Sequence, residues 1–206
     1  MILHEFLLSS ASYRVRIALN LKGLSYEARS YKLRAGEQRS PDYLSLNPAG
    51  LVPAMEIDGK TISQSLAIIQ YLDACYPDPP LIPDDPLHRA RIMEIAYTIA
   101  CDIHPLNNLR TLRYLERELG QNETVVQNWY ANWVTLGFAT LEQLLQKIDL
   151  NPFTMGEAPG LAEICLVPQV YNAKRYNVAL ADFPQLVLLS DRASRHPAFA
   201  AATEGM

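Results

Sequence analysis

The chain has 206 residues, of which 49% are apolar and 19% charged, a composition typical of a globular protein with one large or two small cores. Its formal net charge of −4 and pI near 5.6 disfavour nucleic-acid or membrane-surface partners. Met1–Leu8 is apolar but short and is interrupted by His4 and Glu5, so neither a secretory signal nor a membrane span is expected. A cytoplasmic location is expected instead.

The cysteines and histidines do not form a ligand pattern. Cys75, Cys101 and Cys165 are odd in number and far apart, which predicts reduced core thiols rather than a disulfide framework or a zinc site. The histidines are equally scattered, at His4, His88, His104 and His196. No metal site is predicted.

The first third of the chain alternates short strands and helices. Ile2–Phe6 reads as a strand, and Ser10–Lys22 as a helix that stops at Gly23. Tyr26–Leu33 alternates like a second strand, and Pro41–Leu46 is a short helix.

A hairpin and a further helix complete this part of the chain. Two apolar runs, Val52–Ile57 and Lys60–Ile62, are joined by Asp58-Gly59, which tolerates the positive φ of a tight turn. Ser63–Tyr76 is helical. The order β-α-β-α-β-β-α predicts an α/β thioredoxin-like N-terminal domain over residues 1–80.

Five of the fourteen prolines lie within Tyr76–Pro86, which indicates a semi-rigid linker, assigned to residues 81–86. After it the pattern predicts an all-α C-terminal domain over residues 87–206. Its expected helices are Arg89–Leu119, Val125–Ile148, Leu161–Tyr176 and Leu186–Ser194. The tail Ala200–Met206 is predicted to be frayed.

Three segments of the first domain carry candidate chemistry. Ser9–Arg16 places serines between the first strand and the first helix, where hydroxyls cap the helix and the helix dipole favours an anion; a capping role alone is the alternative. Leu51-Val52-Pro53 opens the third strand and either marks an edge or contains a cis proline that frees the Val52 backbone for an extended peptide. Ser63-Gln64-Ser65 starts a helix and offers a carboxylate site.

Together these segments outline a groove for a small acidic peptide that carries a thiol. The chain resembles the zeta-class glutathione transferases, the family of maleylacetoacetate and maleylpyruvate isomerases. The resemblance extends over nearly the whole chain and includes Ser9–Leu19, Leu46-Asn47-Pro48, Leu51-Val52-Pro53, Asp58-Gly59, Gln64–Ile69, Asp102–Arg110 and Cys165–Gln169. It implies the glutathione transferase fold, glutathione as cofactor and a homodimer.

The resemblance also implies roles for individual residues. Ser9, with Ser10 beside it, would donate to the glutathione sulfur, since a hydroxyl donor favours the nucleophilic thiolate. The remaining glutathione-binding residues would be Val52 and a cis Pro53 at the cysteine, Gln64 and Ser65 at the γ-glutamyl end, Gln38 at the glycyl end, and His104 and Asn108 from the helical domain.

Arg110 and Arg175 match positions that the family places over its substrate, and guanidinium suits the carboxylates of a small acidic molecule. The alternative is that both arginines are surface or helix-pairing residues. Arg14 and Arg16 are expected to support packing and salt links.

The chain departs from the family pattern at three places. Ala11 stands where the family often has cysteine, and Leu8 where some isomerases have arginine. Gly160 replaces the usual Ser/Thr helix cap, with Glu163 in place of aspartate to satisfy the first turn.

The function expected from the resemblance is glutathione-dependent cis–trans isomerisation of maleylacetoacetate or maleylpyruvate in aromatic catabolism. A transferase that conjugates or dehalogenates apolar electrophiles is the first alternative, which Leu8 favours and the two arginines disfavour. A non-enzymatic interaction module is the second, and the intact set Ser9, Pro53, Gln64 and Ser65 argues against it.

Overall fold

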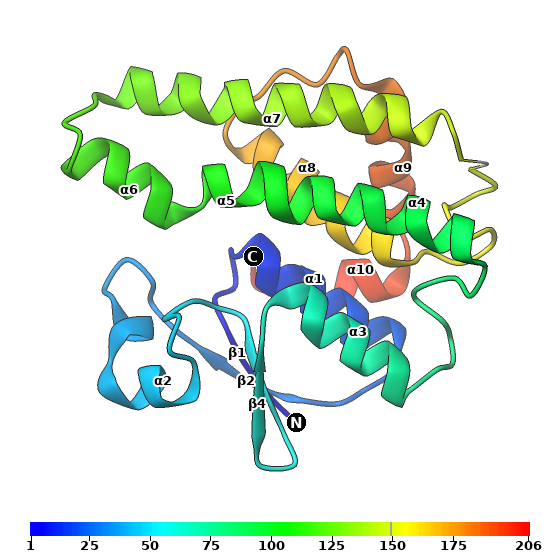
Figure 1. The fold of residues 1–206 in the computed structure, drawn as a ribbon, viewed down its shortest axis with the longest axis horizontal. Helices are drawn as coiled ribbons and strands as arrows, with labels where there is room; N and C mark the ends of the chain where they lie inside the picture. The colour runs from blue at the N-terminus through cyan, green and yellow to red at the C-terminus, as the bar shows by residue number, and fades with distance from the viewer. Residues whose placement is uncertain (149) are drawn as a thin grey trace. The chain divides into compact units, whose positions relative to one another are not determined.

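The computed structural model describes residues 1–148 and 150–206, which form two compact units. Unit 1 comprises Met1–Leu81 and Arg195–Met206, and unit 2 comprises Ile82–Ser194. The course of the chain through both can be followed in Figure 1. The C-terminal segment therefore groups with the unit that contains the sheet.

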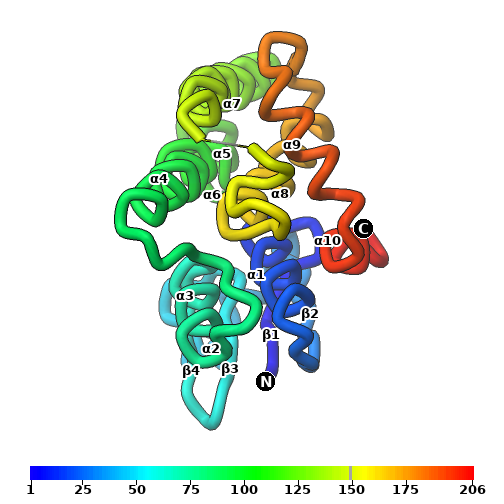
Figure 2. Tube along the Cα trace, turned by 90° about the vertical axis from the view of Figure 1, so that its right-hand side faces the viewer, coloured from blue at the N-terminus to red at the C-terminus, as the bar shows by residue number. Residues whose placement is uncertain are grey.

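Unit 1 has the predicted thioredoxin-like order. Its elements are β1 (Ile2–Glu5), α1 (Ser10–Leu21), β2 (Glu27–Ser30), the 3-10 turn η1 (Glu37–Arg39), α2 (Pro41–Leu46), β3 (Ala54–Ile57), β4 (Lys60–Ser63), α3 (Ser65–Cys75) and α10 (Pro197–Ala201). The four-stranded sheet has the order β2-β1-β3-β4 (Figure 2), with β1 and β2 parallel and the other pairs antiparallel. The second strand is shorter than predicted, and all four of its residues are exposed, because β2 is an edge strand.

Alternation along the strands gives the sheet two different faces. On one face apolar residues pack against α1 and α3, which lie side by side (Figures 1 and 2). This core consists of Leu3, Val15, Leu19, Met55, Ile57, Ile68 and Leu72. The β3–β4 turn is as predicted, since Asp58 and Gly59 have φ of 50° and 74°.

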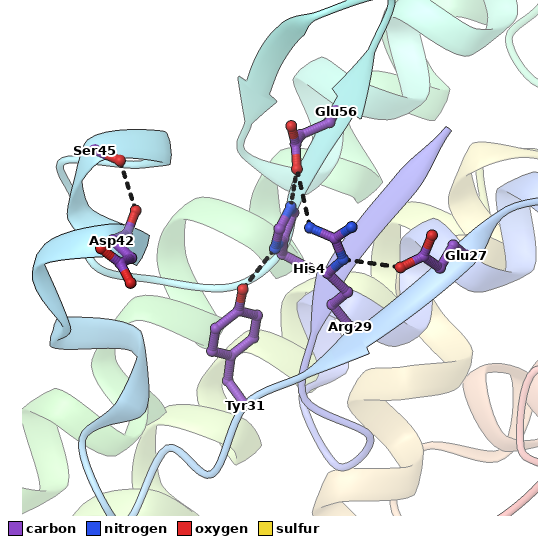
Figure 3. A network of polar contacts seen from close by, with 7 residues as sticks. All are labelled: His4, Glu27, Arg29, Tyr31, Asp42, Ser45 and Glu56. Carbon is purple, nitrogen blue, oxygen red and sulfur yellow. Dashed lines mark hydrogen bonds and ion pairs between the residues drawn. The ribbon is translucent and has the colours of Figure 1, made fainter.

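The opposite face of the sheet is polar (Figure 3). His4 on β1 is fully buried there, with Nε2 2.6 Å from Oε1 of Glu56 on β3 and Nδ1 2.7 Å from the Tyr31 hydroxyl. Arg29 on β2 lies 3.9 Å from the same Glu56 oxygen. These contacts join three neighbouring strands and account for a buried histidine within an apolar strand.

The prediction of a frayed C-terminal tail is wrong. Phe199 is fully buried and Ala202 almost so, and α10 packs against α1. Arg16 on α1 donates to the Ala202 carbonyl (3.0 Å) and pairs with buried Glu5. Arg16 thus has the packing and ion-pair role expected of it, and a single buried guanidinium fastens the tail to the sheet.

The Pro-rich segment after α3 is fastened by Lys22 at the end of α1. Its Nζ donates to Oδ1 of Asp73 (2.6 Å) and to the carbonyls of Tyr76 (2.6 Å) and Pro79 (2.5 Å). Asp73 Oδ1 also accepts from the backbone N–H of Leu81 at 2.8 Å. All three ammonium protons are therefore used inside the protein.

Unit 2 is helical, as predicted. Its elements are α4 (Pro86–Tyr97), the π-helical turn η2 (Thr98–Ile103), α5 (His104–Asn107), α6 (Leu109–Arg117), α7 (Glu123–Leu145), α8 (Leu161–Arg175) and α9 (Pro184–Ser194). The single helix predicted over Arg89–Leu119 is wrong. The chain widens into η2, and Asn108 is extended (ψ 147°) and caps a new helix, so α4, α5 and α6 follow one another as a broken ribbon alongside α7 (Figure 1).

Two contacts from α7 hold this broken ribbon. Gly137 lies so close to Ile103 that a Cβ would collide with its side chain. Nearer the start of α7, Trp129 Nε1 donates to the Leu106 carbonyl at 2.8 Å. A side-chain-free position and an indole donor on α7 therefore set the path of the chain on both sides of His104.

Two buried carboxylates complete unit 2. Glu142 on α7 accepts from the backbone N–H groups of Gln185 and Leu186, both at 2.9 Å, and so caps α9 from another helix. Glu163 accepts from the N–H of Gly160 (2.9 Å), as expected for a capping box, and also from Thr154. Burial raises the pKa of the Glu163 carboxyl.

The cysteines only partly match their expected positions. Cys165 is buried, but Cys75 and Cys101 are exposed, so the prediction of core thiols is wrong for these two. Across the described ranges 1–148 and 150–206, no group of three or more His, Cys, Asp or Glu side chains could hold a metal ion. No helix in those ranges is long and apolar enough to cross a membrane.

Candidate functional site

The candidate segments of unit 1 all adjoin the same end of the strands of the sheet. The register pairs His4 with Ala54 and Ala54 with Ser63, while Glu5 lies beside Ser30. The end of β1, the end of β2, the start of β3 and the end of β4 therefore coincide. We call this end of the sheet the binding edge, because α1, α3 and the Val52-Pro53 segment all begin there.

Ser9 is the N-cap of α1. Its Oγ accepts from the Ser12 N–H at 3.3 Å, and the residue has extended backbone (φ −77°, ψ 117°). The capping interpretation is therefore correct as far as it goes, but it uses only an acceptor lone pair of the hydroxyl. The Ser9 proton can still be donated to an anion, and Ser10, which follows in the first turn, is buried.

The Val52–Pro53 bond is cis, as the resemblance implies. The carbonyl before it, that of Leu51, accepts from the Tyr43 hydroxyl at 2.5 Å and from Asn47 Nδ2 at 2.8 Å. Within the described chain, the Val52 backbone makes no hydrogen bond of its own. Tyr43 and Asn47 thus hold the loop through the Leu51 carbonyl, while the N–H and carbonyl of Val52 stay available to an extended ligand.

Gln64 and Ser65 occupy the start of α3. Gln64 has φ 73° and ψ 118°, a sparsely populated conformation for a non-glycine residue, and its side chain is exposed and does not cap the helix. Ser65 is buried, and its Oγ accepts from Nη1 of Arg14 at 3.3 Å. Because Arg14 occupies a lone pair of the hydroxyl, the Ser65 proton is directed elsewhere.

Gln38 lies in η1, between β2 and α2. Its Nε2 donates to the Leu33 carbonyl at 3.4 Å. Its Oε1 is buried and has no hydrogen-bond partner among the residues that the structure describes. The Gln38 amide oxygen therefore has acceptor capacity that no described residue uses, and its contact with glutathione stays a prediction.

The binding edge favours an anionic peptide. The N-termini of α1 and α3, each a helix of more than two turns, open at it, and their dipoles are positive there. Arg14, which is 1% exposed, adds a buried positive charge next to Ser65. An extended peptide with carboxylates and a thiol fits this set of donors, whereas a cation does not.

In unit 2 the predicted residues His104 and Asn108 lie together. Nε2 of His104 is 3.3 Å from Nδ2 of Asn108, whose Oδ1 accepts from the Arg110 N–H at 3.1 Å and caps α6. Between them, both amide atoms of Asn107 are buried without a partner in the described part of the chain. Their contact with glutathione stays a prediction.

The two predicted substrate arginines are exposed. Arg110 is in the first turn of α6, and Arg175 ends α8, where its Cζ lies 5.6 Å from the centre of the Tyr176 ring. Neither forms an ion pair with any described residue. Both guanidinium groups thus keep their donors for a ligand.

Sequence reasoning missed the residues that support these positions. Tyr43 and Asn47 hold the Leu51 carbonyl, but the sequence marked only a helix end there. Arg14 was expected to support packing and salt links, and it also donates directly to the Ser65 hydroxyl. The one available signal was an arginine on the otherwise apolar side of the first helix.

Comparisons with known proteins agree with this geometry. Residues 8–75 match the model of the glutathione S-transferase N-terminal domain. A maleylacetoacetate isomerase from Pseudomonas aeruginosa is 46% identical over 200 residues, which cover 96% of this chain and 92% of that protein.

Two solved structures are similar over both units. A holo maleylpyruvate isomerase, a bacterial zeta-class glutathione S-transferase, has a TM-score of 0.93 and 38% identity, covering 98% of this chain and 96% of that one. A maleylacetoacetate isomerase from Methylobacterium extorquens AM1, with bound malonate and glutathione, has a TM-score of 0.94 and 34% identity at the same coverages. The chain belongs to the zeta-class glutathione transferases, the family of the maleylacetoacetate and maleylpyruvate isomerases.

Proposed function

We propose that this protein is a glutathione-dependent cis–trans isomerase of maleylacetoacetate or maleylpyruvate. The observation that carries the proposal is the anion-binding edge of unit 1. The two exposed arginines of unit 2, which no described acidic residue neutralises, support it separately. The relatives named as these isomerases, at up to 46% identity over nearly the whole chain, support the same reaction.

The residues of unit 1 would bind and activate the cofactor. When bound, glutathione would supply a thiolate that can add to the cis double bond, leaving a single bond that can rotate, and can leave again as the double bond re-forms. Ser9 would donate a hydrogen bond from its hydroxyl to the sulfur. This bond favours the anion, which lowers the pKa of the thiol and raises the thiolate fraction near neutral pH. Val52 would pair with the cysteinyl backbone, Gln64 and Ser65 would bind the γ-glutamyl end, and Gln38 would accept an N–H near the glycyl end.

The residues of unit 2 would serve the substrate. Maleylacetoacetate and maleylpyruvate carry acidic ends, and negative charge develops on a carbonyl oxygen when the double bond is attacked. Arg110 and Arg175 would bind the carboxylates through paired N–H donors, and His104 and Asn108 would line the ligand cleft. In this scheme residues 1–80 hold glutathione, 81–86 are the linker, and the substrate is held within the predicted domain 87–206 by the part that belongs to unit 2, which ends at Ser194.

We also propose that the protein is a cytoplasmic homodimer that acts in aromatic compound catabolism on a small acidic molecule. The family resemblance supports the dimer and the pathway. The acidic balance (22 Asp and Glu against 18 Lys and Arg) argues against nucleic acid as a partner. The wide sequence spacing of the three cysteines suits a reducing compartment.

The proposal is tested by the conversion of maleylacetone with catalytic glutathione, followed by ultraviolet absorbance. Arg110→Ala and Arg175→Ala should each lower kcat/KM about 10- to 150-fold, because a charged hydrogen bond is lost. Turnover of 1-chloro-2,4-dinitrobenzene, which has no carboxylate, should change little. The exposed Arg117 on α6 provides the matched control, Arg117→Ala.

Two results would reject the isomerase in favour of its alternatives. Equal losses on both substrates would make the arginines structural, and the conjugating transferase would then be favoured. Absence of glutathione binding at millimolar concentration by titration calorimetry would instead favour a non-enzymatic module.

A further inference from the structure

The guanidinium of Arg175 lies over an aromatic ring. Its Cζ lies 5.6 Å from the centre of the Tyr176 ring, within the range of about 6 Å over which a cation is attracted to a ring face. An arginine held over a ring by this attraction still has its N–H groups as donors to other partners. Arg175 is exposed and forms no ion pair with the residues in ranges 1–148 and 150–206.

Tyr176 is in turn held by a second ring. It stacks on Tyr130 with ring centres 4.0 Å apart and an angle of 15° between the ring planes. Tyr130 projects from α7 and is 3% exposed, whereas Tyr176 is 40% exposed. An exposed ring at the end of α8 is therefore fixed against a buried ring of another helix.

The electrostatics of Tyr130 agree with this arrangement. Burial raises the pKa of its phenol, Tyr176 acts in the same direction, and the positive charge of Arg175 acts against both. The cation is thus close enough to influence the buried member of the stack as well as the exposed one. Tyr130, Tyr176 and Arg175 form one continuous array that runs from the interior of unit 2 to its surface.

We propose that Tyr176, anchored by Tyr130, is a positioning residue that orients Arg175 toward a carboxylate of the substrate and so favours acidic substrates. This inference rests on the proposed function, since it deepens the role of Arg175. A long arginine side chain normally loses rotational freedom about several bonds when it binds a carboxylate. Contact with a fixed ring already restricts that freedom before the substrate arrives.

The test compares Tyr176→Leu, Tyr176→Phe, Arg175→Ala and the double variant Tyr176→Leu/Arg175→Ala at saturating glutathione. Tyr176→Leu should lower kcat/KM for maleylacetone about 2- to 5-fold, mainly through KM, because the ring face is lost. Tyr176→Phe keeps the ring and should retain nearly full activity. In the Arg175→Ala background, Tyr176→Leu should cause no further loss, since its effect passes through the arginine.

Two outcomes would overturn the inference. One is a further loss from Tyr176→Leu when Arg175 is already alanine, which would mean that Tyr176 acts without the arginine. The other is an equal loss with 1-chloro-2,4-dinitrobenzene, which would make the effect structural. Tyr114→Leu, at an exposed tyrosine on α6, controls for the loss of a surface ring.

A wild-type protein that binds glutathione but does not isomerise maleylacetone would reject the proposed function, not this inference. Malonate binding, measured by calorimetry with glutathione present, then gives the same comparison. A 2- to 5-fold weaker binding by Tyr176→Leu, absent in the Arg175→Ala background, would support the positioning role. Equal binding by the wild type and Tyr176→Leu would overturn it.

Discussion

The ammonium of Lys22 offers the sharpest test of how unit 1 is held together. Its side chain is fully buried, pairs with Asp73 (13% exposed) and also satisfies the carbonyls of Tyr76 and Pro79. Lys22→Met keeps most of the aliphatic volume but removes the charge and three donors. Asp73 then keeps the Leu81 N–H but loses its cation, and two carbonyls lose their partner.

Removing one partner of a buried ion pair costs about 3–5 kcal/mol, because the remaining charge is left in a poorly solvated place. For a chain of this size that corresponds to a Tm lower by roughly 6–20 °C. Asp73→Asn should cost less, since the amide oxygen can still accept from Lys22 and Leu81. The double variant Lys22→Met/Asp73→Leu should recover part of the loss, because no buried charge remains.

Thermal and urea unfolding would be followed by far-ultraviolet circular dichroism. Both tryptophans, Trp129 and Trp133, belong to unit 2, so their fluorescence reports that unit separately. Lys60→Met, at an exposed lysine on β4, is the matched control and should cost under about 0.5 kcal/mol. If Lys22→Met shifts the unfolding midpoint no more than this control, the contacts of Lys22 do not stabilise unit 1.

Three further substitutions test other buried polar groups. Glu163→Gln puts an amide donor against the Gly160 N–H and should lower the free energy of unfolding by about 1–3 kcal/mol near pH 4. Burial raises the pKa of the Glu163 carboxyl in the folded state, so the stability advantage of the wild type should shrink as the pH rises above about 4.3 through that raised pKa. Glu142→Gln leaves one first-turn N–H of α9 unpaired and should cost about 1–3 kcal/mol by tryptophan-monitored unfolding, against an exposed Glu118→Gln control. Tyr43→Phe removes one of two donors to the Leu51 carbonyl and should weaken glutathione binding about 2- to 10-fold by calorimetry, while an exposed Tyr114→Phe should not. Because burial raises the pKa of Tyr43 to about 12, the wild-type affinity should show no tyrosine titration near pH 10.

Local signals were sufficient for the order of strands and α-helices in Met1–Leu81, the first part of unit 1. Asp58-Gly59 predicted the hairpin because positive φ is a property of those two residues, and both adopt it. Pro41 at the first turn and Gly23 after α1 likewise mark helix ends without help from distant residues. Such boundaries can be read within a few positions of the chain.

Contacts between distant positions could not be read in this way. His4 looked like an interruption of an apolar strand, but its partner Glu56 is 52 positions away. The tail seemed frayed because nothing near Ala200 in the sequence reveals Arg16, which is 186 positions from the carbonyl that it binds. Gly137 on α7 lies against Ile103, within the broken stretch between α4 and α6, and its missing side chain is an advantage only because Ile103 is there.

The same distinction explains which site residues were found. The binding edge consists of backbone groups, helix N-termini and hydroxyls that adjoin strand ends, so a short motif with the correct strand order brings its parts together. The residues that orient those groups act from elsewhere: Tyr43 and Asn47 from α2 and the residue after it, and Arg14 from within α1. A motif therefore identifies the groups that would touch a ligand, but not the groups that hold them in place.

Arg175 shows what this distinction means for specificity. An arginine at the end of a helix is common, and its position alone does not distinguish a substrate clamp from a surface charge. The guanidinium lies close to the ring of Tyr176, and that ring stacks on Tyr130, 46 positions earlier in the chain. These contacts restrict where the charge can lie before any ligand is present. Chains that share this arginine but lack the two stacked tyrosines should therefore have a higher KM for the same carboxylate substrate. Selectivity for acidic substrates would then depend on a residue that never touches them.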